Sequence, residues 1–350
     1  MEQDAAPGLG LTHAALESYL VDRIDGFSGL RGVEKYGTGQ SNPTYRIDAD
    51  SGTLVLRSQP PGRLLPSAHA VDREYRAMAA LAGTQVPVPE VLHLAEREAS
   101  PSGRAFFVMR HLDGRIFWDP ALPECSVEER AAIYDAMNAT LAALHSVDVQ
   151  AVGLADFGKP GDYFARQLGR WRGQYLASVA EPSPEMKEII GWLERHAPED
   201  DGQVALVHGD WRLDNLIFAK DAPRIIGVLD WELSTLGHPI ADLAYQCMQW
   251  RLPNRGEMRG LGGVDRAALG LPGEADYVAA YARRRGLDGV EDWTAWLVFA
   301  FFRLAAILAG VAARAEGGNA SNPELARKYG AAVPVLAGMA LEVIAEGSDG

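Results

Sequence analysis

Two short segments in the second half of the chain constrain its fold more than any other feature. Residues 207–218 place Asp210 and Asn215 between two apolar runs. In residues 227–232, Asp230 comes directly after a third apolar run, which spans residues 225–229. Short runs of Val, Leu, Ile and Phe bounded by turn residues predict buried strands. We therefore expect the three polar side chains on loops that a sheet holds at both ends, where functional groups concentrate.

The spacing of these three side chains suits the transfer of a phosphoryl group. Such a reaction needs positioning and charge stabilisation from the protein more than covalent chemistry. Asp210 would accept the proton of the attacking hydroxyl, and Asn215 and Asp230 would bind Mg²⁺ through hard oxygen atoms. The sequence therefore predicts a kinase that uses ATP and Mg²⁺.

The sequence His208-Gly209-Asp210, with Asn five residues later and an apolar strand ending in Asp, resembles the aminoglycoside phosphotransferase and choline kinase superfamily. The resemblance covers most of the chain and implies an α+β, protein-kinase-like fold with two lobes. It implies a small antiparallel β lobe with a leading helix and a nucleotide-phosphate loop over residues 1–109. A larger, mainly helical lobe over residues 110–350 would contain the catalytic loop, the metal site and the acceptor pocket.

The first half of the chain contains partial matches to the nucleotide-binding parts of this fold, in the expected order. Between two strand-like runs, residues 36–45 include Gly37, Gly39, Ser41 and Asn42. Glycines allow a backbone to approach phosphates closely, and Asn42 stands where the kinase loop has its third glycine. A Gly-x-Gly between strands is often an ordinary turn, so this prediction depends on the downstream motif.

A cation and an acid follow this loop. Arg57 ends the strand-like run 52–57, where the superfamily usually has lysine, and would pair with the ATP phosphates and with Glu74 on the following helix. The alternative is a surface arginine at a strand end. Further on, the strand-like run 105–110 leads into the connection between the lobes.

The resemblance implies that backbone groups of Met109, Arg110 and Leu112 in this connection bind the adenine. It also places Arg212 where protein kinases have a phosphate-contacting lysine, which makes Arg212 a candidate catalytic residue beside Asp210. His208 is expected to be a structural hydrogen-bonding residue of the catalytic loop.

Several phrases, including Phe302-Arg303-Leu304-Ala305-Ala306-Ile307, are similar to one branch of the superfamily. That branch comprises kinase-like modules related to those fused to acyl-CoA dehydrogenases, and Arg57 is usual within it. Its members are associated with phosphorylating short hydroxyacyl-CoA substrates, particularly at the 4-position. The resemblance therefore implies a 4-hydroxyacyl-CoA acceptor and a functional link to an acyl-CoA dehydrogenase.

Net charge limits the classes of partner that the chain can bind, and cysteine content indicates its compartment. The formal net charge of −14 argues against a nucleic acid or an anionic membrane, and would suit a cationic acceptor such as an aminoglycoside or choline. Four arginines cluster after the metal motif and could contact the phosphates of CoA, although a solvated basic face or structural ion pairs would explain them equally well: Arg251, Arg255, Arg259 and Arg266. The two cysteines, Cys125 and Cys247, have no paired spacing, so a reducing cytoplasm is the expected compartment.

Two polar residues in apolar surroundings are expected to have structural roles. Residues 293–311 are almost continuously apolar and long enough for a membrane span, yet Arg303 near their centre favours a buried helix of the larger lobe. Asp242, just after Pro239 begins a helix, is expected to accept backbone donors of the catalytic loop.

Other classes of function remain open from the sequence alone. A nucleotide-binding pseudokinase would keep the fold without transfer, although it usually lacks the base or a metal ligand, and Asp210, Asn215 and Asp230 are all present. A hydrolase is disfavoured because no Gly-x-Ser-x-Gly sequence occurs. A protein kinase is disfavoured by the glycine of the His-Gly-Asp motif and by the lack of an Ala-Pro-Glu segment after Asp230. We therefore predict a small-molecule O-phosphotransferase whose acceptor is an alcohol group.

Overall fold

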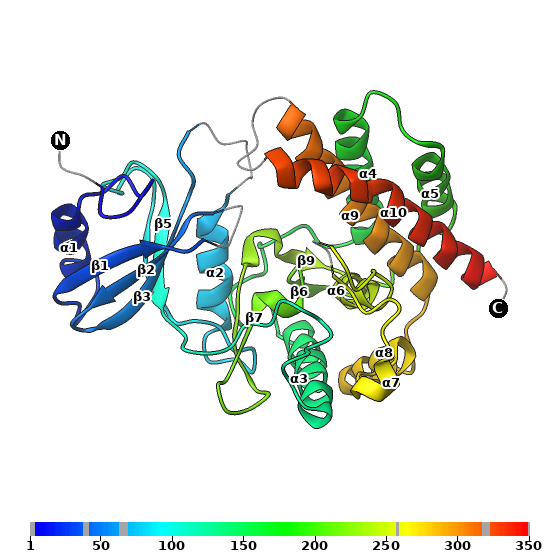
Figure 1. Ribbon diagram of the computed structural model, residues 1–350, viewed down its shortest axis with the longest axis horizontal. Helices are drawn as coiled ribbons and strands as arrows, with labels where there is room; N and C mark the ends of the chain where they lie inside the picture. Colours follow the sequence, from blue (N-terminus) through cyan, green and yellow to red (C-terminus); the bar gives the residue numbers. More distant parts are fainter. Residues whose placement is uncertain (1–3, 38–41, 63–68, 257–258, 317–322, 349–350) are drawn as a thin grey trace. The chain divides into compact units, whose positions relative to one another are not determined.

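The computed structural model describes residues 4–37, 42–62, 69–256, 259–316 and 323–348, and Figure 1 shows its helices and strands. The chain forms two compact units. Unit 1 contains Met1–Ile116, Gln150–Leu154 and Asp214–Ser234, and unit 2 contains Phe117–Val149, Ala155–Leu213 and Thr235–Gly350. The predicted α+β class is confirmed, because an antiparallel sheet dominates the first unit and helices dominate the second. The division at residue 109 into functional lobes stays a prediction.

Unit 1 is built on an antiparallel sheet with the strand order β1-β2-β3-β5-β4. In β2, Tyr45 and Ile47 are fully buried and alternate with more exposed residues, as a strand with one face in the core requires. They pack with Leu16 and Leu20 of helix α1 in the apolar core on that face of the sheet. The strands of this sheet and the two helices that pack on it have the following bounds: β1 (Leu30–Lys35), β2 (Thr44–Ala49), β3 (Gly52–Ser58), β4 (Val91–Ala95), β5 (Phe106–Arg110), α1 (His13–Val21) and α2 (Val71–Leu81).

Helix α2 covers the opposite face of this sheet. Arg57 in β3 pairs in register with Phe107 in β5, so both side chains project from the same face. Phe107 contacts the ring of Tyr75 in α2 at a centroid distance of 6.3 Å. The register of β3 therefore turns Arg57 toward α2, where Glu74 precedes Tyr75.

A hairpin in unit 1 holds the segment that was predicted to bind metal. Strands β7 (Leu216–Phe218) and β8 (Ile225–Val228) pair antiparallel. The 3-10 helix η1 (Leu213–Asn215) precedes them at the boundary of the unit, and η2 (Trp231–Leu233) follows them. The predicted strands on both sides of the polar loops are confirmed.

Unit 2 is mainly helical, and its strands β6 and β9 form a short antiparallel pair. Strand β6 leads directly into the His-Gly-Asp motif, and β9 leads into α6, which contains Asp242. Figure 1 shows α9 and α10 crossing alongside α4 and α5 in this unit. The elements of unit 2 span α3 (Val127–His145), α4 (Tyr163–Ser178), α5 (Pro184–Arg195), β6 (Ala205–Val207), β9 (Thr235–Gly237), α6 (Ile240–Cys247), η3 (Met248–Trp250), α7 (Arg266–Leu269), α8 (Glu274–Arg285), α9 (Trp293–Glu316) and α10 (Pro323–Ser348).

The apolar segment around Arg303 forms α9, and Arg303 itself is 6% exposed. By length and composition alone, α9 and α10 could each cross a membrane. In α9, 72% of the apolar window is buried inside the structure, whereas the corresponding share for α10 is 22%. The prediction of a buried helix around Arg303 is therefore confirmed.

Candidate active site

Arg57 is the centre of an ion-pair cluster in unit 1. Its Nε donates to the Glu74 carboxylate at 2.9 Å, and its Nη2 donates to Asp230 Oδ1 at 2.8 Å. Its Nη1 also donates to Thr44 Oγ1 at 3.3 Å. The side chains of Arg57 and Glu74 are 13% and 1% exposed, so water and salt screen this pair little. The predicted pairing of the strand cation with the helix acid is present, and the same cation contacts a predicted metal ligand.

The turn after β8 holds Asp230 in an unusual backbone conformation. Its φ is +64°, in the left-handed region, where Asp is tolerated better than most residues with a side chain. The buried Trp231 anchors the turn, because its indole N–H donates to the Val228 carbonyl at 3.0 Å. Such conformations persist where the surrounding structure enforces them, and they concentrate at functional sites.

Glu232 is a candidate site residue that the sequence analysis missed. Oxygen atoms of Glu74, Asp230 and Glu232 lie within 4.8 Å of one another. The available signal was local, since Glu232 is an acid two positions after a proposed metal ligand in the same turn. This donor set fits Mg²⁺, which prefers hard oxygen atoms and binds through one or two carboxylates.

Burial raises the pKa of Glu74 to about 7, against the lowering effect of Arg57, and the nearby Asp230 and Glu232 raise it further. Burial lowers the pKa of Arg57, but Glu74 and Asp230 outweigh it and raise the pKa above its ordinary value. Arg57 therefore stays charged, and the three acids repel one another around it. An added cation would relieve that repulsion, as expected of a site for a divalent metal.

Asn42 joins this cluster through its side chain. It is 2% exposed, and its Nδ2 lies 2.9 Å from Glu74 Oε1 and 3.3 Å from Glu232 Oε2. Its Oδ1 lies 3.0 Å from His69 Nδ1. Asn42 thus fixes two of the three acids.

The other predicted phosphate-loop residues are Gly37, which is exposed, and Gly39 and Ser41, which lie outside the described residues.

Asn215 and the backbone of the connection between the predicted lobes also belong to unit 1. The Leu229 amide, next to Asp230, donates to the Asn215 carbonyl at 2.9 Å, so the two predicted metal ligands lie on adjacent backbone segments. In the connection, the Arg110 amide already donates to the Glu90 carbonyl at 2.8 Å.

Met109 is 7% exposed and pairs within the sheet, and the amide of His111 donates to the Thr53 carbonyl at 3.4 Å. Of the predicted adenine contacts, the amide of Leu112 is therefore the best candidate donor.

The catalytic loop in unit 2 is held by Asp242 of α6. The His208 amide donates to Asp242 Oδ2 at 2.6 Å, and the Gly209 amide donates to Oδ1 at 2.9 Å. Gly209 has φ +84°, a left-handed conformation that favours glycine at this position. His208 is fully buried, and its Nδ1 accepts from the Asp210 amide at 3.2 Å. The predicted structural roles of His208 and Asp242 are both observed.

A second layer fixes Asp242. His145 Nε2 lies 3.3 Å from Asp242 Oδ2, and His145 Nδ1 lies 2.6 Å from the Tyr281 hydroxyl. Burial lowers the pKa of His145, which favours the neutral ring. Since a carboxylate only accepts, a neutral His145 carries its proton on Nε2, and its Nδ1 accepts from Tyr281.

Asp210 has the environment expected of an ionised base. Its carboxylate accepts a hydrogen bond from Tyr245, and Arg212 Nε lies 3.9 Å from its Oδ1. Burial raises the pKa of Asp210, but Arg212, His208, the Tyr245 hydrogen bond and Arg303 together leave it below its ordinary value. The carboxylate is therefore ionised at neutral pH, and its side chain is still 24% exposed.

Two of the arginines that could have contacted CoA phosphates already have acidic partners in unit 2. Arg251 pairs with Glu274 at 2.9 Å and with Glu346 at 2.6 Å. Arg259 pairs with Asp119 at 3.1 Å. These contacts favour the structural interpretation of the cluster.

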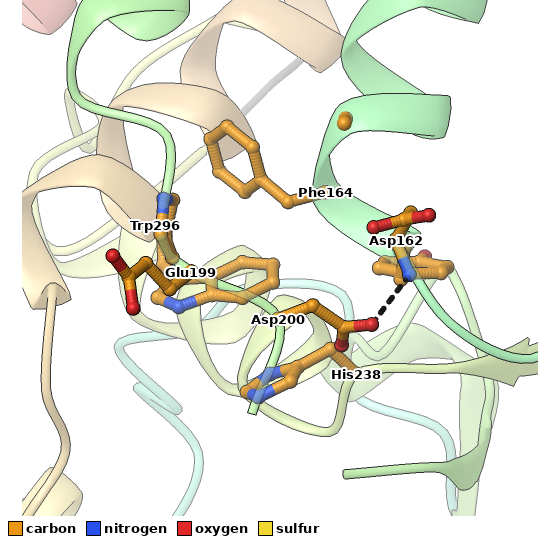
Figure 2. Close-up of a pocket in the computed structure, with 9 residues that line it drawn as sticks. Asp162, Phe164, Glu199, Asp200, His238 and Trp296 are labelled. Carbon is orange, nitrogen blue, oxygen red and sulfur yellow. Dashed lines mark hydrogen bonds between the residues drawn. The ribbon is translucent and has the colours of Figure 1, made fainter. Parts of the chain in front are cut away.

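A small cavity in unit 2 is lined by other residues, among them Phe164, Asp200, His238 and Trp296. Figure 2 shows Asp200 accepting a hydrogen bond from the Asp162 amide, at 2.9 Å, beside Phe164. The ring of His238 stacks on Trp296 at a centroid distance of 4.5 Å. The cavity measures about 50 Å³, which suits a few water molecules, whereas small-molecule sites occupy roughly 300–1,000 Å³. It is therefore not a candidate for the nucleotide or acceptor site.

With this geometry established, comparison with known proteins identifies the family. A family model described as "Phosphotransferase enzyme family" matches residues 32–297. The chain belongs to this phosphotransferase family. Acyl-CoA dehydrogenase family member 10 of Mus musculus is 45% identical over 316 residues, which cover 90% of this chain and 29% of that protein. Acyl-CoA dehydrogenase family member 11 of Rattus norvegicus is 41% identical over 315 residues, which cover 89% of this chain and 40% of that protein.

The phosphotransferase chain thus spans less than half the length of these curated relatives. A crystal structure from Ralstonia eutropha, of a protein provisionally assigned as an aminoglycoside phosphotransferase, is 45% identical with a TM-score of 0.85 and covers 95% of this chain and 98% of that chain. The predicted superfamily, its acyl-CoA dehydrogenase-associated branch and the predicted enzyme class are confirmed.

More distant structures share the fold of this phosphotransferase. Choline kinase from Cryptosporidium parvum is 12% identical with a TM-score of 0.65, covering 95% of this chain and 96% of that chain. A thermostable mutant of the aminoglycoside phosphotransferase APH(4)-Ia, in a ternary complex with ADP and hygromycin B, is 16% identical with a TM-score of 0.59, covering 92% and 97%. At this level of identity the likeness extends to the fold alone.

Proposed function

We propose that this phosphotransferase transfers the γ-phosphoryl group of ATP to a hydroxyl group of a small molecule, with Asp210 as the proton acceptor. The environment of Asp210 supports the proposal most directly. Its carboxylate is ionised, oriented by Tyr245 and partly exposed, which are the properties a base needs to meet a substrate hydroxyl. Arg212, 3.9 Å from Asp210, would neutralise charge on the transferred group.

The nucleotide side of the proposal rests on the cluster in unit 1. Arg57, held by Glu74, would contact the phosphates, and Asp230 and Glu232 of the acidic cluster would bind Mg²⁺. Asn215, which precedes the same hairpin, would be a further ligand. When bound, Mg²⁺ would offset charge on the phosphates. The backbone of residues 37–42 would approach the phosphates, and the segment 109–112 the adenine.

For the acceptor we propose a hydroxyacyl-CoA, with 4-hydroxyacyl-CoA as the specific candidate. The proposal is supported by the relatives, which are named as acyl-CoA dehydrogenase family members. The same names motivate a functional link to an acyl-CoA dehydrogenase. The net charge of −14 instead favours a cationic acceptor, so an aminoglycoside or choline-type acceptor is the second candidate. A pseudokinase is the third, and a turnover assay separates it from the other two.

The first experiment is Mg²⁺-dependent ADP release from ATP with a panel of acceptors: 4-hydroxyacyl-CoAs, the matching free acids, choline and aminoglycosides. Asp210→Asn serves as the blank, and Asp221→Asn, the same change at an exposed residue, serves as the matched control. General bases typically contribute about 10²- to 10⁴-fold, so Asp210→Asn should lose at least a hundredfold in kcat. Asp221→Asn should match the wild type.

Turnover confined to CoA thioesters would support the acyl-CoA proposal, whereas turnover on choline or an aminoglycoside would replace it. Calorimetric binding of Mg-ATP checks the division of roles. Asp210→Asn should bind Mg-ATP normally, while Asp230→Asn should lose the Mg²⁺-dependent part of nucleotide affinity. Near-native turnover by Asp210→Asn would refute its assignment as the base.

A further inference from the structure

Arg303 lies in an environment that is costly for a cation. It sits in the middle of the apolar helix α9 and is 6% exposed. Within the described part of the chain, no carboxylate lies within ion-pair distance of its guanidinium, and its Nε has no hydrogen-bond partner. A buried charge without an ion-pair partner is destabilising, because burial removes its hydration and no opposite charge compensates for the loss. Packing alone would favour an apolar residue here, so the contacts of the guanidinium require an explanation.

The guanidinium holds the peptide group immediately before Asp210. Arg303 Nη2 donates to the Gly209 carbonyl at 2.5 Å. The Asp210 amide belongs to the same planar peptide group and donates to His208 Nδ1 at 3.2 Å. This peptide is therefore fixed at both its oxygen and its nitrogen. Its orientation sets the direction in which the Asp210 side chain leaves the backbone.

The guanidinium also contacts the residue that orients the Asp210 carboxylate. Its central carbon lies 5.2 Å from the ring centroid of Tyr245 and 5.5 Å from that of Trp171, within the range of cation–π attraction. The Tyr245 hydroxyl hydrogen-bonds the Asp210 carboxylate. Arg303 thus supports both the backbone and the side-chain partner of Asp210.

We propose that Arg303 is a positioning residue for Asp210, which it aims through the Gly209 peptide and through Tyr245. The proposal rests on the function proposed above, in which Asp210 is the base. Among the described residues, the charged or titratable groups that shift the pKa of Asp210 include Arg212 and His208 on its own loop, Tyr245 on α6 and Arg303 on α9.

The direction of the charge effect follows from these groups. Burial raises the pKa of Asp210, and Arg303 is one of the groups that lower it. Removing the charge of Arg303 therefore raises this pKa. Since the ionised form is the active base, the acidic limb of the pH–rate profile should move to higher pH.

Three variants and one control test the proposal. Arg303→Met keeps the length of the side chain without the charge, Arg303→Lys keeps the charge, and Tyr245→Phe removes only the hydroxyl that bonds Asp210. Arg314→Met, the same change at an exposed residue of α9, is the matched control. The measurements are kcat, KM for Mg-ATP and the pH–rate profile on the acceptor that the panel identifies. Carboxyl ¹³C NMR of Asp210, assigned with Asp210→Asn, reports its titration without turnover.

We expect Arg303→Met to lower kcat by about tenfold or more, below the roughly 10²- to 10⁴-fold ascribed to a base itself, with KM for Mg-ATP unchanged. Its pH–rate limb and its NMR titration should both move to higher pH. Arg303→Lys should restore most of both shifts, and Arg314→Met should show neither. Unchanged kcat and an unchanged Asp210 titration in a folded Arg303→Met would overturn the proposal.

If Arg303→Met does not fold, Tyr245→Phe decides the question, because it leaves the guanidinium in place. A lower kcat with a shifted Asp210 titration supports the proposal, and wild-type values refute it. The NMR titration keeps the two proposals separate. Absence of turnover in the wild type would contradict the proposed function, whereas an Asp210 titration that ignores Arg303 and Tyr245 would contradict this inference alone.

Discussion

The Asp242→Asn variant tests whether one buried carboxylate holds the catalytic loop. Asp242 is 1% exposed and accepts hydrogen bonds from the amides of His208 and Gly209 at 2.6 and 2.9 Å. His145 Nε2 lies 3.3 Å from Asp242 Oδ2. Asparagine has nearly the same shape, so the change removes charge and one acceptor without leaving a cavity. The asparagine side chain has one terminal oxygen and one NH₂ group. The NH₂ group would therefore point its hydrogens at one of the two backbone N–H groups and leave that N–H without an acceptor.

The expected cost follows from the hydrogen bonds. Bonds to a charged group contribute about 1.5–3 kcal/mol each, so the two amides account for roughly 3–6 kcal/mol, of which a neutral amide oxygen recovers about 1. We therefore expect the free energy of unfolding to fall by about 2–5 kcal/mol at neutral pH. That is a large part of the stability of a typical domain, which is roughly 5–15 kcal/mol.

The pH dependence gives an independent check. Burial raises the pKa of Asp242, but His145, His208 and the Gly209 amide outweigh it, and the folded-state pKa is lowered. The folded protein therefore binds fewer protons than the unfolded chain in the acid range. The stabilisation is fully present above the unfolded pKa of about 3.9 and is lost as the pH falls through the folded-state value. The difference between wild type and Asp242→Asn should shrink over the same range.

Urea unfolding followed by tryptophan fluorescence at several pH values measures the effect, with Asp288→Asn, an exposed residue of the same unit, as the matched control. If the two units unfold separately, the loss should be confined to the transition of unit 2. A midpoint shift in Asp242→Asn no larger than that of Asp288→Asn would refute the argument that the carboxylate holds the loop.

Two further substitutions test other buried contacts. Arg57→Met removes the partner of two carboxylates and should raise KM for Mg-ATP about tenfold or more. Initial rates measure this KM, and Arg46→Met on the same sheet is the control. Equal KM values for the two variants would assign the phosphate contact to another cation. Tyr281→Phe leaves His145 Nδ1 without its hydroxyl partner and should cost about 1–3 kcal/mol in urea unfolding. Tyr277→Phe is its control, because that buried hydroxyl has no hydrogen-bond partner in the described structure, and equal losses in both variants would contradict the prediction.

Local sequence pattern was sufficient for much of this architecture. The strands before and after the polar loops followed from short apolar runs, whereas the pairing of Arg57 with Glu74 was implied by the resemblance to the kinase-like superfamily. The structural role of Asp242 followed from its position at the start of a helix after the metal motif. In each case the chemistry and the order along the chain left few alternative partners.

Contacts between distant segments were not predictable in the same way. The Asn42 amide lies 3.3 Å from Glu232, a residue 190 positions away, and Arg303 reaches the Gly209 carbonyl across 94 positions. A sequence motif identifies the type of side chain, whereas these contacts depend on the packing of whole helices and sheets. Arg303 was recognisable as a buried cation from its apolar neighbours, but its partner was not.

The division of the candidate chemistry between the two units determines what each class of variant can report. The cluster around Arg57, Glu74 and Asp230 lies in unit 1, so changes there should act mainly on Mg-ATP affinity. Asp210 and the groups that hold it lie in unit 2, so changes there should act mainly on kcat. A variant of unit 2 that weakens Mg-ATP binding while leaving kcat unchanged would contradict this division of roles.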